Sequence, residues 1–200
     1  LAGEIIDAAT DLLIAAGDDS AVSTRSVAAR VGVTPPSIYL HFADKQELLD
    51  EVWLRYFESI DSVLEAAGDG VDDPLERLVR MGMAYVRFAA SAPALYRLLD
   101  VRTPGKGHGS KGDEALMTSA FVRFHEVVAE LVESGGVTDR APGDLVLELW
   151  AAAHGIASLM IALPDLGWDT DLSHAEHMFT VLSRGILTSG SPRADTVEQP

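Results

Sequence analysis

The amino-acid sequence predicts an all-α protein in which a compact unit of short helices precedes a larger helical bundle. Apolar residues recur three and four positions apart along most of the 200 residues, which is the spacing of amphipathic helices. The period-two alternation of strands and the Asn-Gly turns of hairpins are both absent from the sequence. These patterns predict nine helices, three of which lie within the first 42 residues.

The N-terminal elements are delimited by glycines. The first predicted helix ends at Gly17, and two short helices follow over residues 23–31 and 35–42. A longer helix begins near Lys45 and ends before the glycine-rich break at residues 68–70.

The remaining helices are longer and more apolar. Asp73 and Pro74 fit an N-cap followed by a first-turn proline, and they predict a helix that continues to about Ser91. Four more helices are expected over residues 93–100, 113–133, 142–163 and 173–188. Glycines and a proline predict a mobile loop over residues 101–112. The sequence thus divides into a three-helix unit (1–47), a helical bundle (48–188) and a disordered tail (189–200).

Composition excludes several classes of protein. Hydrophobic residues make up 48% and charged residues 23%, a balance typical of globular domains. The absence of cysteine excludes a disulfide framework, a thiolate metal site and a cysteine nucleophile. The most apolar stretch, residues 145–163, is interrupted by Glu148, His154 and Ser158. Without an unbroken run of about 20 apolar residues or an export leader, we expect a cytoplasmic protein with no membrane partner.

The segment from Ser23 to Lys45 has the layout of a helix-turn-helix. The hydroxyl of Ser23 can cap the first short helix, and Ala28 is small enough for a second helix to cross close to it. Gly32 can adopt the left-handed conformation that a tight turn between the two helices requires. Thr34 can cap the second helix.

The second short helix has a buried side and an exposed side. Pro35 suits its first turn, while Val33 and Ile38 supply apolar anchors for the crossing. In a helix-turn-helix this second helix enters the major groove of DNA. The residues expected on its exposed face are Thr34, Pro35, Ser37, Leu40 and His41.

The same segment resembles the DNA-binding unit of the TetR family of transcriptional regulators. The first helix ends in the sequence AAG at residue 17, residues 38–42 read IYLHF, and Lys45 opens the next helix. The resemblance covers residues 3 to about 57, and the nine-helix count agrees with the fold of that family.

The resemblance implies which residues contact DNA. Thr24, Arg25 and Lys45 are expected to bind phosphates, and the N-terminal dipole of its helix should assist Lys45. Contacts between the second helix and bases are expected to be mainly apolar, to thymine methyl groups. The complete predicted set is Thr24, Arg25, Thr34, Pro35, Pro36, Ser37, Tyr39, Leu40, His41 and Lys45.

Charge weighs on this interpretation in two ways. The net charge of −16, taken alone, argues against a nucleic-acid-binding protein. Residues 23–45 reverse the sign, with three basic residues and one acidic residue, and screening beyond about 8 Å lets the local patch govern phosphate contact. The exposed face lacks Arg, Lys, Asn and Gln, so DNA shape or a basic arm upstream of Leu1 is expected to share the recognition.

Aromatic and methionine residues at helical spacing fill the C-terminal part. They either pack the core or line an apolar ligand cavity between helices. The resemblance implies an effector pocket, and Trp150-x-x-x-His154-Gly155 resembles a motif of one TetR subgroup. His154 is interpreted either as a structural histidine or as a polar ligand contact, and Gly155 predicts a helix crossing. The candidate pocket residues are Tyr85, Phe88, Met117, Phe121, Phe124, Trp150 and His154.

The last two helices, over residues 142–163 and 173–188, are expected to form a homodimer surface, as the resemblance implies. The first of them is apolar on nearly all sides, so it needs more than one neighbour. A twofold dimer also suits DNA recognition, because half-sites about 34–36 Å apart require two recognition helices.

No catalytic residue, metal site or cofactor is expected. His174 and His177 lack the HExxH spacing, and residues 105–111 do not fit the GxxxxGK[ST] phosphate loop. An enzyme is therefore not indicated. We expect a homodimeric regulator that binds a palindromic operator and represses until a small, mostly apolar ligand releases it. The alternative is a helical interaction module that has lost DNA binding.

Overall fold

The computed structural model describes residues 1–17, 19–96, 120–134, 140–169 and 171–188. Across those residues the regular structure is entirely helical, which confirms the all-α prediction. The N-terminal elements are α1 (Ala2–Ala16), a single 3₁₀ turn (Asp19–Ala21), α2 (Thr24–Val31) and α3 (Pro35–Ile38). The long elements are α4 (Lys45–Gly68), α5 (Pro74–Ser91), α8 (Ala120–Glu133), α9 (Pro142–Ala162) and α10 (Ser173–Thr188). Residues 93–96 are also helical.

The helix boundaries mostly match the sequence patterns. The bounds of α5 and α10 agree with the prediction at both ends. At the start of α5, the side chain of Asp73 accepts a hydrogen bond from the amide of Glu76 at 2.9 Å, as the predicted N-cap requires. The remainder of the predicted helix 93–100, the loop 101–112, the start of the helix 113–133 and the tail 189–200 lie outside the described residues.

The second helix of the helix-turn-helix is shorter than predicted. It was expected to reach residue 42, but α3 ends at Ile38 and a turn follows. The amides of His41 and Phe42 both donate to the carbonyl of Ile38 at 3.0 Å, so the chain closes on that residue. The backbone then becomes extended at Asp44, the N-cap of α4.

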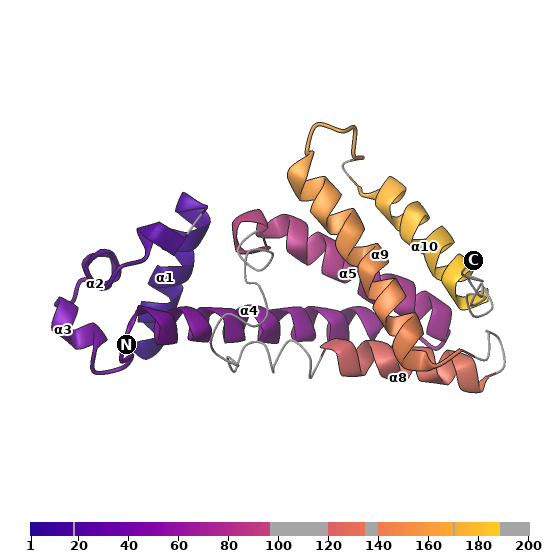
Figure 1. Cartoon of the computed structure of the whole chain (residues 1–200), viewed down its shortest axis with the longest axis horizontal. Helices are drawn as coiled ribbons and strands as arrows, with labels where there is room; N and C mark the ends of the chain where they lie inside the picture. The colour runs from indigo at the N-terminus through magenta and orange to yellow at the C-terminus, as the bar shows by residue number, and fades with distance from the viewer. Residues whose placement is uncertain (18, 97–119, 135–139, 170, 189–200) are drawn as a thin grey trace, which may run out of the picture.

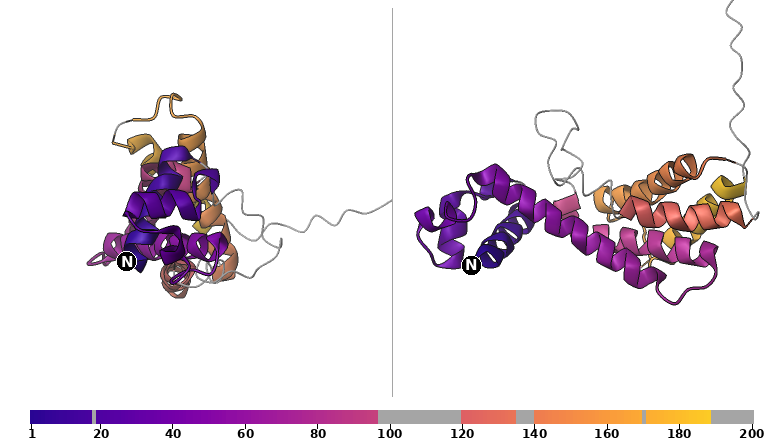
Figure 2. Two further views of the ribbon diagram at one scale, coloured as in Figure 1. Left: turned by 90° about the vertical axis from the view of Figure 1, so that its left-hand side faces the viewer. Right: turned by 90° about the horizontal axis from the view of Figure 1, so that it is seen from below.

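The long helix α4 joins the two parts of the molecule. Figures 1 and 2 show the unit of α1 to α3 at one end, the bundle at the other, and α4 running between them. One continuous apolar core follows this helix, from Ile5 of α1 through Trp53 of α4 to Val128 of α8. The predicted boundary between the three-helix unit and the bundle, at residues 47 and 48, falls within the first turn of α4. Both parts therefore share this helix.

Two glycines differ from expectation. The sequence predicted a helix crossing at Gly155, but a Cβ atom there would meet nothing within 4 Å in this chain. The close approach is instead at Gly82 of α5, where a Cβ would lie 2.0 Å from the ring of Phe179 in α10. Position 82 has room only for glycine because of Phe179, which lies almost a hundred residues further along the chain. No local sequence pattern reveals this contact.

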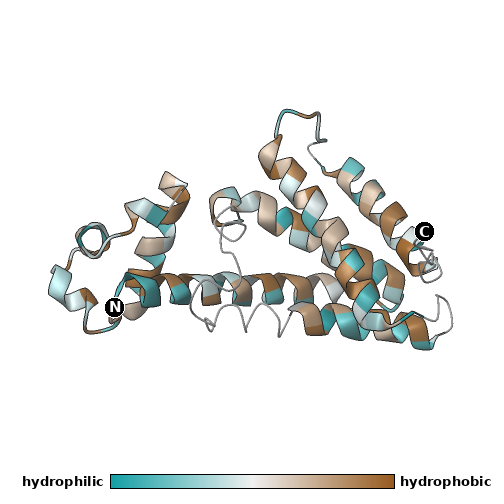
Figure 3. Cartoon of the chain, in the orientation of Figure 1, coloured by the Kyte–Doolittle hydropathy of each residue, from teal (hydrophilic) through white to brown (hydrophobic). Residues whose placement is uncertain are grey.

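Helix α9 is apolar on more than one side. Leu145 and Leu149 are buried in the core, whereas Leu147 and Leu159 remain 57% and 46% exposed. Figure 3 shows hydrophobic residues along this helix. By length and composition, with a mean hydropathy of 1.7, α9 meets the criterion for a membrane-crossing helix despite the interruptions noted in the sequence. One such helix is weak evidence for a membrane span, because the core helix of a soluble protein meets the same criterion, and α5, α8 and α10 pack against α9.

Candidate nucleic-acid interface and bundle site

The first helix of the helix-turn-helix is fixed by a reciprocal cap. Ser23 has an extended backbone, and its hydroxyl accepts from the amide of Ser26 at 3.1 Å. The amide of Ser23 donates in return to the hydroxyl of Ser26 at 2.9 Å. At the other end Gly32 has φ +80°, and both Gly32 and Val33 donate to the carbonyl of Ala28 at 2.9 Å. The predicted cap and the predicted left-handed turn are both present.

The start of α3 differs from its prediction. Thr34 occupies the N-cap position, but its hydroxyl makes no hydrogen bond to a backbone amide. Pro35 and Pro36 have no N–H to offer, and the amide of Ser37 donates to the backbone carbonyl of Thr34 at 2.9 Å. The Thr34 hydroxyl instead lies 2.9 Å from the hydroxyl of Ser37. Both hydroxyls are thereby held on the outer side of the first turn.

The outward surface of α3 and the turn after it is apolar and open. Ile38 is buried at 3% exposure and anchors the helix, whereas Leu40 is 81% exposed and Tyr39 58% exposed. Pro35, Pro36 and His41 are also exposed, and Ser37 is half-buried. Leu40, Tyr39 and the two prolines are exposed together on one short segment, and a contiguous apolar surface of this kind favours a contact with another molecule.

A hollow lies between the N-terminus of α2 and the start of α3. It is open to solvent, has a volume of about 460 Å³ and is lined by Ser23, Thr24, Arg25, Pro35 and Tyr39. The hydroxyls of Thr24 and Tyr39 lie 3.3 Å apart, so the two helices present them together. Arg25 is exposed, and no ion pair joins it to a carboxylate in the described part of the chain. Hydroxyl groups beside an unpaired guanidinium suit a phosphate.

The surroundings of Lys45 differ from expectation. Its Nζ donates to the backbone carbonyl of Asp19 at 2.5 Å and lies 3.5 Å from the Asp19 carboxylate. The N-terminus of α4 is already capped, because the carboxylate of Asp44 accepts from the amide of Glu47 at 2.9 Å. That carboxylate satisfies one amide of the first turn, and the assistance of the helix dipole to a phosphate at Lys45 stays a prediction.

The bundle holds a polar centre among aromatic rings. Nδ1 of His154 in α9 lies 3.1 Å from the hydroxyl of Tyr85 in α5 and 2.9 Å from that of Tyr96. The hydroxyl of Tyr96 also donates to the carbonyl of His154 at 3.1 Å. The ring of Trp150 stacks on His154 with centroids 4.9 Å apart, and Phe121 of α8 lies 5.6 Å from Trp150. Both interpretations of His154 remain open, because it is hydrogen-bonded and only half-buried.

The predicted pocket residues do not all gather there. Tyr85, Phe121, Trp150 and His154 form one connected cluster. Phe88 packs instead on Tyr56 of α4, with centroids 5.1 Å apart, and burial raises the pKa of that tyrosine. Phe124 is buried in the core, and Met117 lies outside the described residues. Sequence reasoning omitted Tyr96 from the pocket, although its hydroxyl is central to the cluster.

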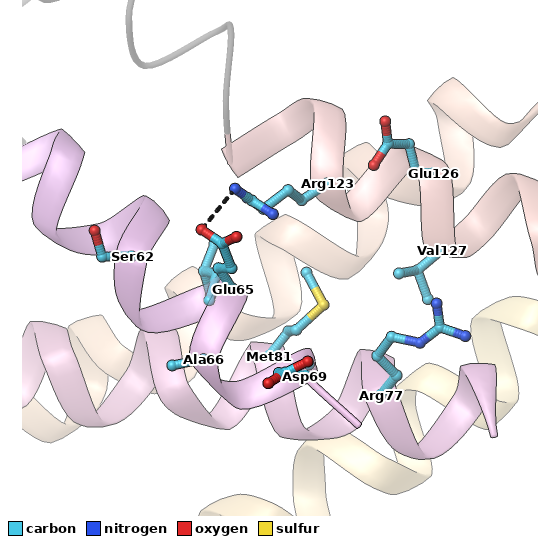
Figure 4. A pocket seen from close by; sticks show the side chains of 11 residues that line it. Ser62, Glu65, Ala66, Asp69, Arg77, Met81, Arg123, Glu126 and Val127 are labelled. Carbon is cyan, nitrogen blue, oxygen red and sulfur yellow. Dashed lines mark hydrogen bonds and ion pairs between the residues drawn. The ribbon is translucent and has the colours of Figure 1, made fainter. Parts of the chain in front are cut away.

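A charged cleft of about 570 Å³ opens between α4, α5 and α8. Arg123 of α8 donates from Nε to Asp61 at 2.7 Å and pairs through Nη2 with Glu65 at 3.0 Å. Figure 4 shows Arg123 and Glu65 on one side of the cleft and Arg77 on the other. The hydrogen bond to Asp61 raises the pKa of Arg123 above its usual value, and these contacts join α8 to α4.

His174, near the start of α10, is engaged at the surface. Nδ1 of His174 lies 3.0 Å from the carboxylate of Asp169, whose pKa is lowered by hydrogen bonds from Ser173 and His174. Within the described residues, no group of three or more metal-ligating side chains could hold an ion.

A capped helix, a glycine turn and a short exposed helix, carried by α4 into a helical bundle, define a helix-turn-helix transcriptional regulator that binds DNA. The family model "Bacterial regulatory proteins, tetR family" matches residues 5–52. A second model, "Tetracyclin repressor-like, C-terminal domain", matches residues 78–182. The chain belongs to the TetR family of bacterial regulators.

Solved structures agree on the fold. A protein of unknown function from Rhodococcus sp. RHA1 is 24% identical, with 93% of each chain covered and a TM-score of 0.75. The regulator FadR from Bacillus subtilis, solved with stearoyl-CoA, is 14% identical over 92% of this chain and 97% of its own, with a TM-score of 0.74. A tetR-family regulatory protein from Rhodococcus RHA1 is 19% identical, covering 94% and 97%, with a TM-score of 0.70. No curated protein matches the chain.

Proposed function

We propose that this regulator is a homodimeric repressor that binds a palindromic operator through α3 and is released by a small, mostly apolar ligand. The observation that carries the proposal is the position of Leu40, which is 81% exposed on the same unit as the open hollow at Arg25. In this proposal residues 1–47 bind DNA in the cytoplasm, and residues 48–188 bind the ligand and the second copy.

The DNA contacts divide by chemistry. Leu40, Pro35 and Pro36 offer apolar surface, which suits thymine methyl groups in the major groove. Thr24 and Arg25 bind the phosphate backbone from the hollow, with Tyr39 and Lys45 beside them. Ser37, His41 and Thr34 supply the few polar groups that reach base edges. With so few hydrogen-bonding side chains, sequence-dependent DNA shape carries much of the specificity.

The second copy covers the outward side of α9 and α10. Several large apolar side chains on these two helices are exposed: Leu147, Leu159, Val181 and Leu182. Exposure of this kind marks an interaction surface in a protein that is otherwise well packed. A twofold contact between identical helix pairs would bury these residues and place one α3 at each end of the dimer.

The ligand occupies the aromatic cluster of the bundle. Tyr85, Phe121, Trp150 and His154 contact one another yet stay only half-buried, so part of their surface is open. Stacked rings beside one hydrogen-bonding centre suit an apolar molecule with a single polar group. The likeness in fold to FadR, solved with stearoyl-CoA, makes a fatty-acyl compound a reasonable first probe. Release requires that the ligand bind the non-DNA-binding state more tightly.

A second candidate, the interaction module without DNA binding, is favoured by the ion pairs of the N-terminal unit. Arg30 pairs with Asp11 at 2.6 Å, Arg55 with Asp7 at 2.8 Å, and Lys45 with Asp19. Three cations that could bind phosphate are thus neutralised within the chain, which the net charge of −16 reinforces.

Retention of fragmented genomic DNA separates the two candidates. The immobilised chain is incubated with sheared bacterial DNA, and the retained fragments are sequenced. The repressor proposal predicts enrichment of a short palindrome, lost in Leu40→Asp, which places a charge on the apolar face without touching the core. Retention without enrichment, or no retention, favours the interaction module.

A further inference from the structure

Lys45 lies at the edge of the surface that faces DNA in the proposed function. It lines a small cavity together with Ser23, Thr24 and Tyr39, three residues that also line the hollow at Arg25. Its ammonium group would therefore lie close to a phosphate held by Thr24 and Arg25. In the free protein that ammonium group is bound to Asp19 through both the backbone carbonyl and the carboxylate.

Asp19 is positioned by the chain that leads into α2. It begins the 3₁₀ turn Asp19–Ala21, which runs directly into Val22 and the cap residue Ser23. Val22 is 1% exposed and anchors this turn in the core. The carboxylate of Asp19 is 60% exposed, so it lies at the surface and not in a buried ion pair. The carboxylate of Asp19 is an anion, as is the DNA phosphate that would lie near Lys45 in a complex.

We propose that Asp19 competes with DNA phosphate for Lys45 and so lowers the affinity of the regulator for any duplex. This inference rests on the proposed DNA-binding function. On binding, Lys45 exchanges one anion for another, and Asp19 is left beside the negatively charged backbone. Non-specific binding depends mainly on such phosphate contacts, so the competition weakens it most. A regulator with weak non-specific binding discriminates its operator better from the rest of the genome.

The other ion pairs of the N-terminal unit provide matched controls. Asp7 of α1 pairs with Arg55 of α4 at 2.8 Å, and its side chain is 71% exposed. Neither residue lines the two cavities at the DNA-facing surface. Asp7→Asn therefore removes the same charge and frees the same kind of partner, but at a different place.

The test compares Asp19→Asn and Asp7→Asn in the full chain. Asparagine keeps the size of the side chain and the backbone carbonyl contact, and it removes only the charge. Binding to a random-sequence duplex is measured by fluorescence anisotropy over a series of salt concentrations. We expect Asp19→Asn to bind about threefold to tenfold tighter at low salt. The substitution removes the exposed ion pair with Lys45, and it also removes the repulsion between the Asp19 carboxylate and DNA. Asp7→Asn should stay within about twofold of the parent chain.

Lys45→Ala separates competition from simple repulsion. If Asp19 acts through Lys45, the gain from Asp19→Asn shrinks in the Lys45→Ala background, as in a double-mutant cycle. An undiminished gain there, or equal gains for Asp19→Asn and Asp7→Asn, would overturn the competition while leaving DNA binding intact. Failure of every variant to bind duplex DNA would overturn the proposed function and this inference together. Circular dichroism melting of each variant checks that all of them fold.

Discussion

Replacement of Gly82 with alanine tests the closest approach between two helices of the bundle. A Cβ atom at this position would lie 2.0 Å from Cε1 and 2.3 Å from Cζ of Phe179. The ring of Phe179 is 0% exposed, so it cannot turn into solvent to make room. Helices α5 and α10 would have to separate by more than an ångström to restore ordinary contact, and the close-packed interior resists this.

The stability that Gly82→Ala loses is the difference between two opposing effects. Overpacking a well-packed core costs about 3 kcal/mol at the upper end of its usual range. Alanine has a better helix propensity than glycine by about 1 kcal/mol, so the net loss is about 2 kcal/mol. For a chain of this size, that loss lowers the melting temperature by about 4–8 °C.

Urea and thermal denaturation followed by circular dichroism measure this loss. Gly143→Ala in α9 is the matched control, because its Cβ would meet nothing within 4 Å, and it should leave stability unchanged or slightly raised. In a Phe179→Leu background the penalty of Gly82→Ala should shrink, since the smaller side chain leaves space. A Gly82→Ala protein as stable as its parent, or an unchanged penalty in that background, would refute the packing between α5 and α10.

Three further outcomes are expected. Arg25→Ala should weaken binding to all duplex sequences and reduce the slope of log K against log salt by about one; an unchanged slope in a salt titration would remove Arg25 from the phosphate contacts. Leu182→Glu, at an exposed position on α10, should convert the proposed dimer to a monomer near 21.3 kDa in sedimentation, and a dimer that persists would contradict the proposed interface. The pKa of Glu148 is lowered by its hydrogen bond from Arg140, so that pair stabilises the fold above the ordinary glutamate pKa and loses its contribution as the pH falls through the lowered value. Glu148→Gln should therefore lower the melting temperature at pH 7, and this difference should shrink as the pH falls below the ordinary glutamate pKa; a difference that does not depend on pH would exclude the ion pair as the cause.

The local elements could be predicted because their signals lie within a few residues. Ser23 and Gly32 define the ends of α2, and Asp73 with Pro74 defines the start of α5. Each of these effects depends on backbone hydrogen bonds between near neighbours. The helix-turn-helix and the fold class could therefore be predicted from sequence, since both are sums of such local signals.

The contacts that the sequence did not predict involve partners distant in the chain or a competing local hydrogen bond. Thr34 fits an N-cap by type, but Pro36 lacks one of the two amides that it would bind, and the amide of Ser37 donates to the Thr34 backbone carbonyl instead. The partner of Lys45 is Asp19, 26 positions away, and the neighbour of Gly82 is Phe179 on another helix. Tyr96 joins His154 across the bundle in the same way. Such pairings are set by tertiary packing, which residue spacing alone does not encode.

The distance between the two α3 helices on one duplex is the most direct test of the proposed DNA recognition. The chain has no cysteine, so Ala43→Cys, at an exposed position after α3, gives a single spin-labelling site in each copy. Double electron–electron resonance on the complex with an enriched genomic fragment should give a distance near one turn of DNA, about 34–36 Å. The absence of any dipolar signal, or a separation that adjacent major grooves cannot accommodate, would contradict recognition by a pair of inserted helices.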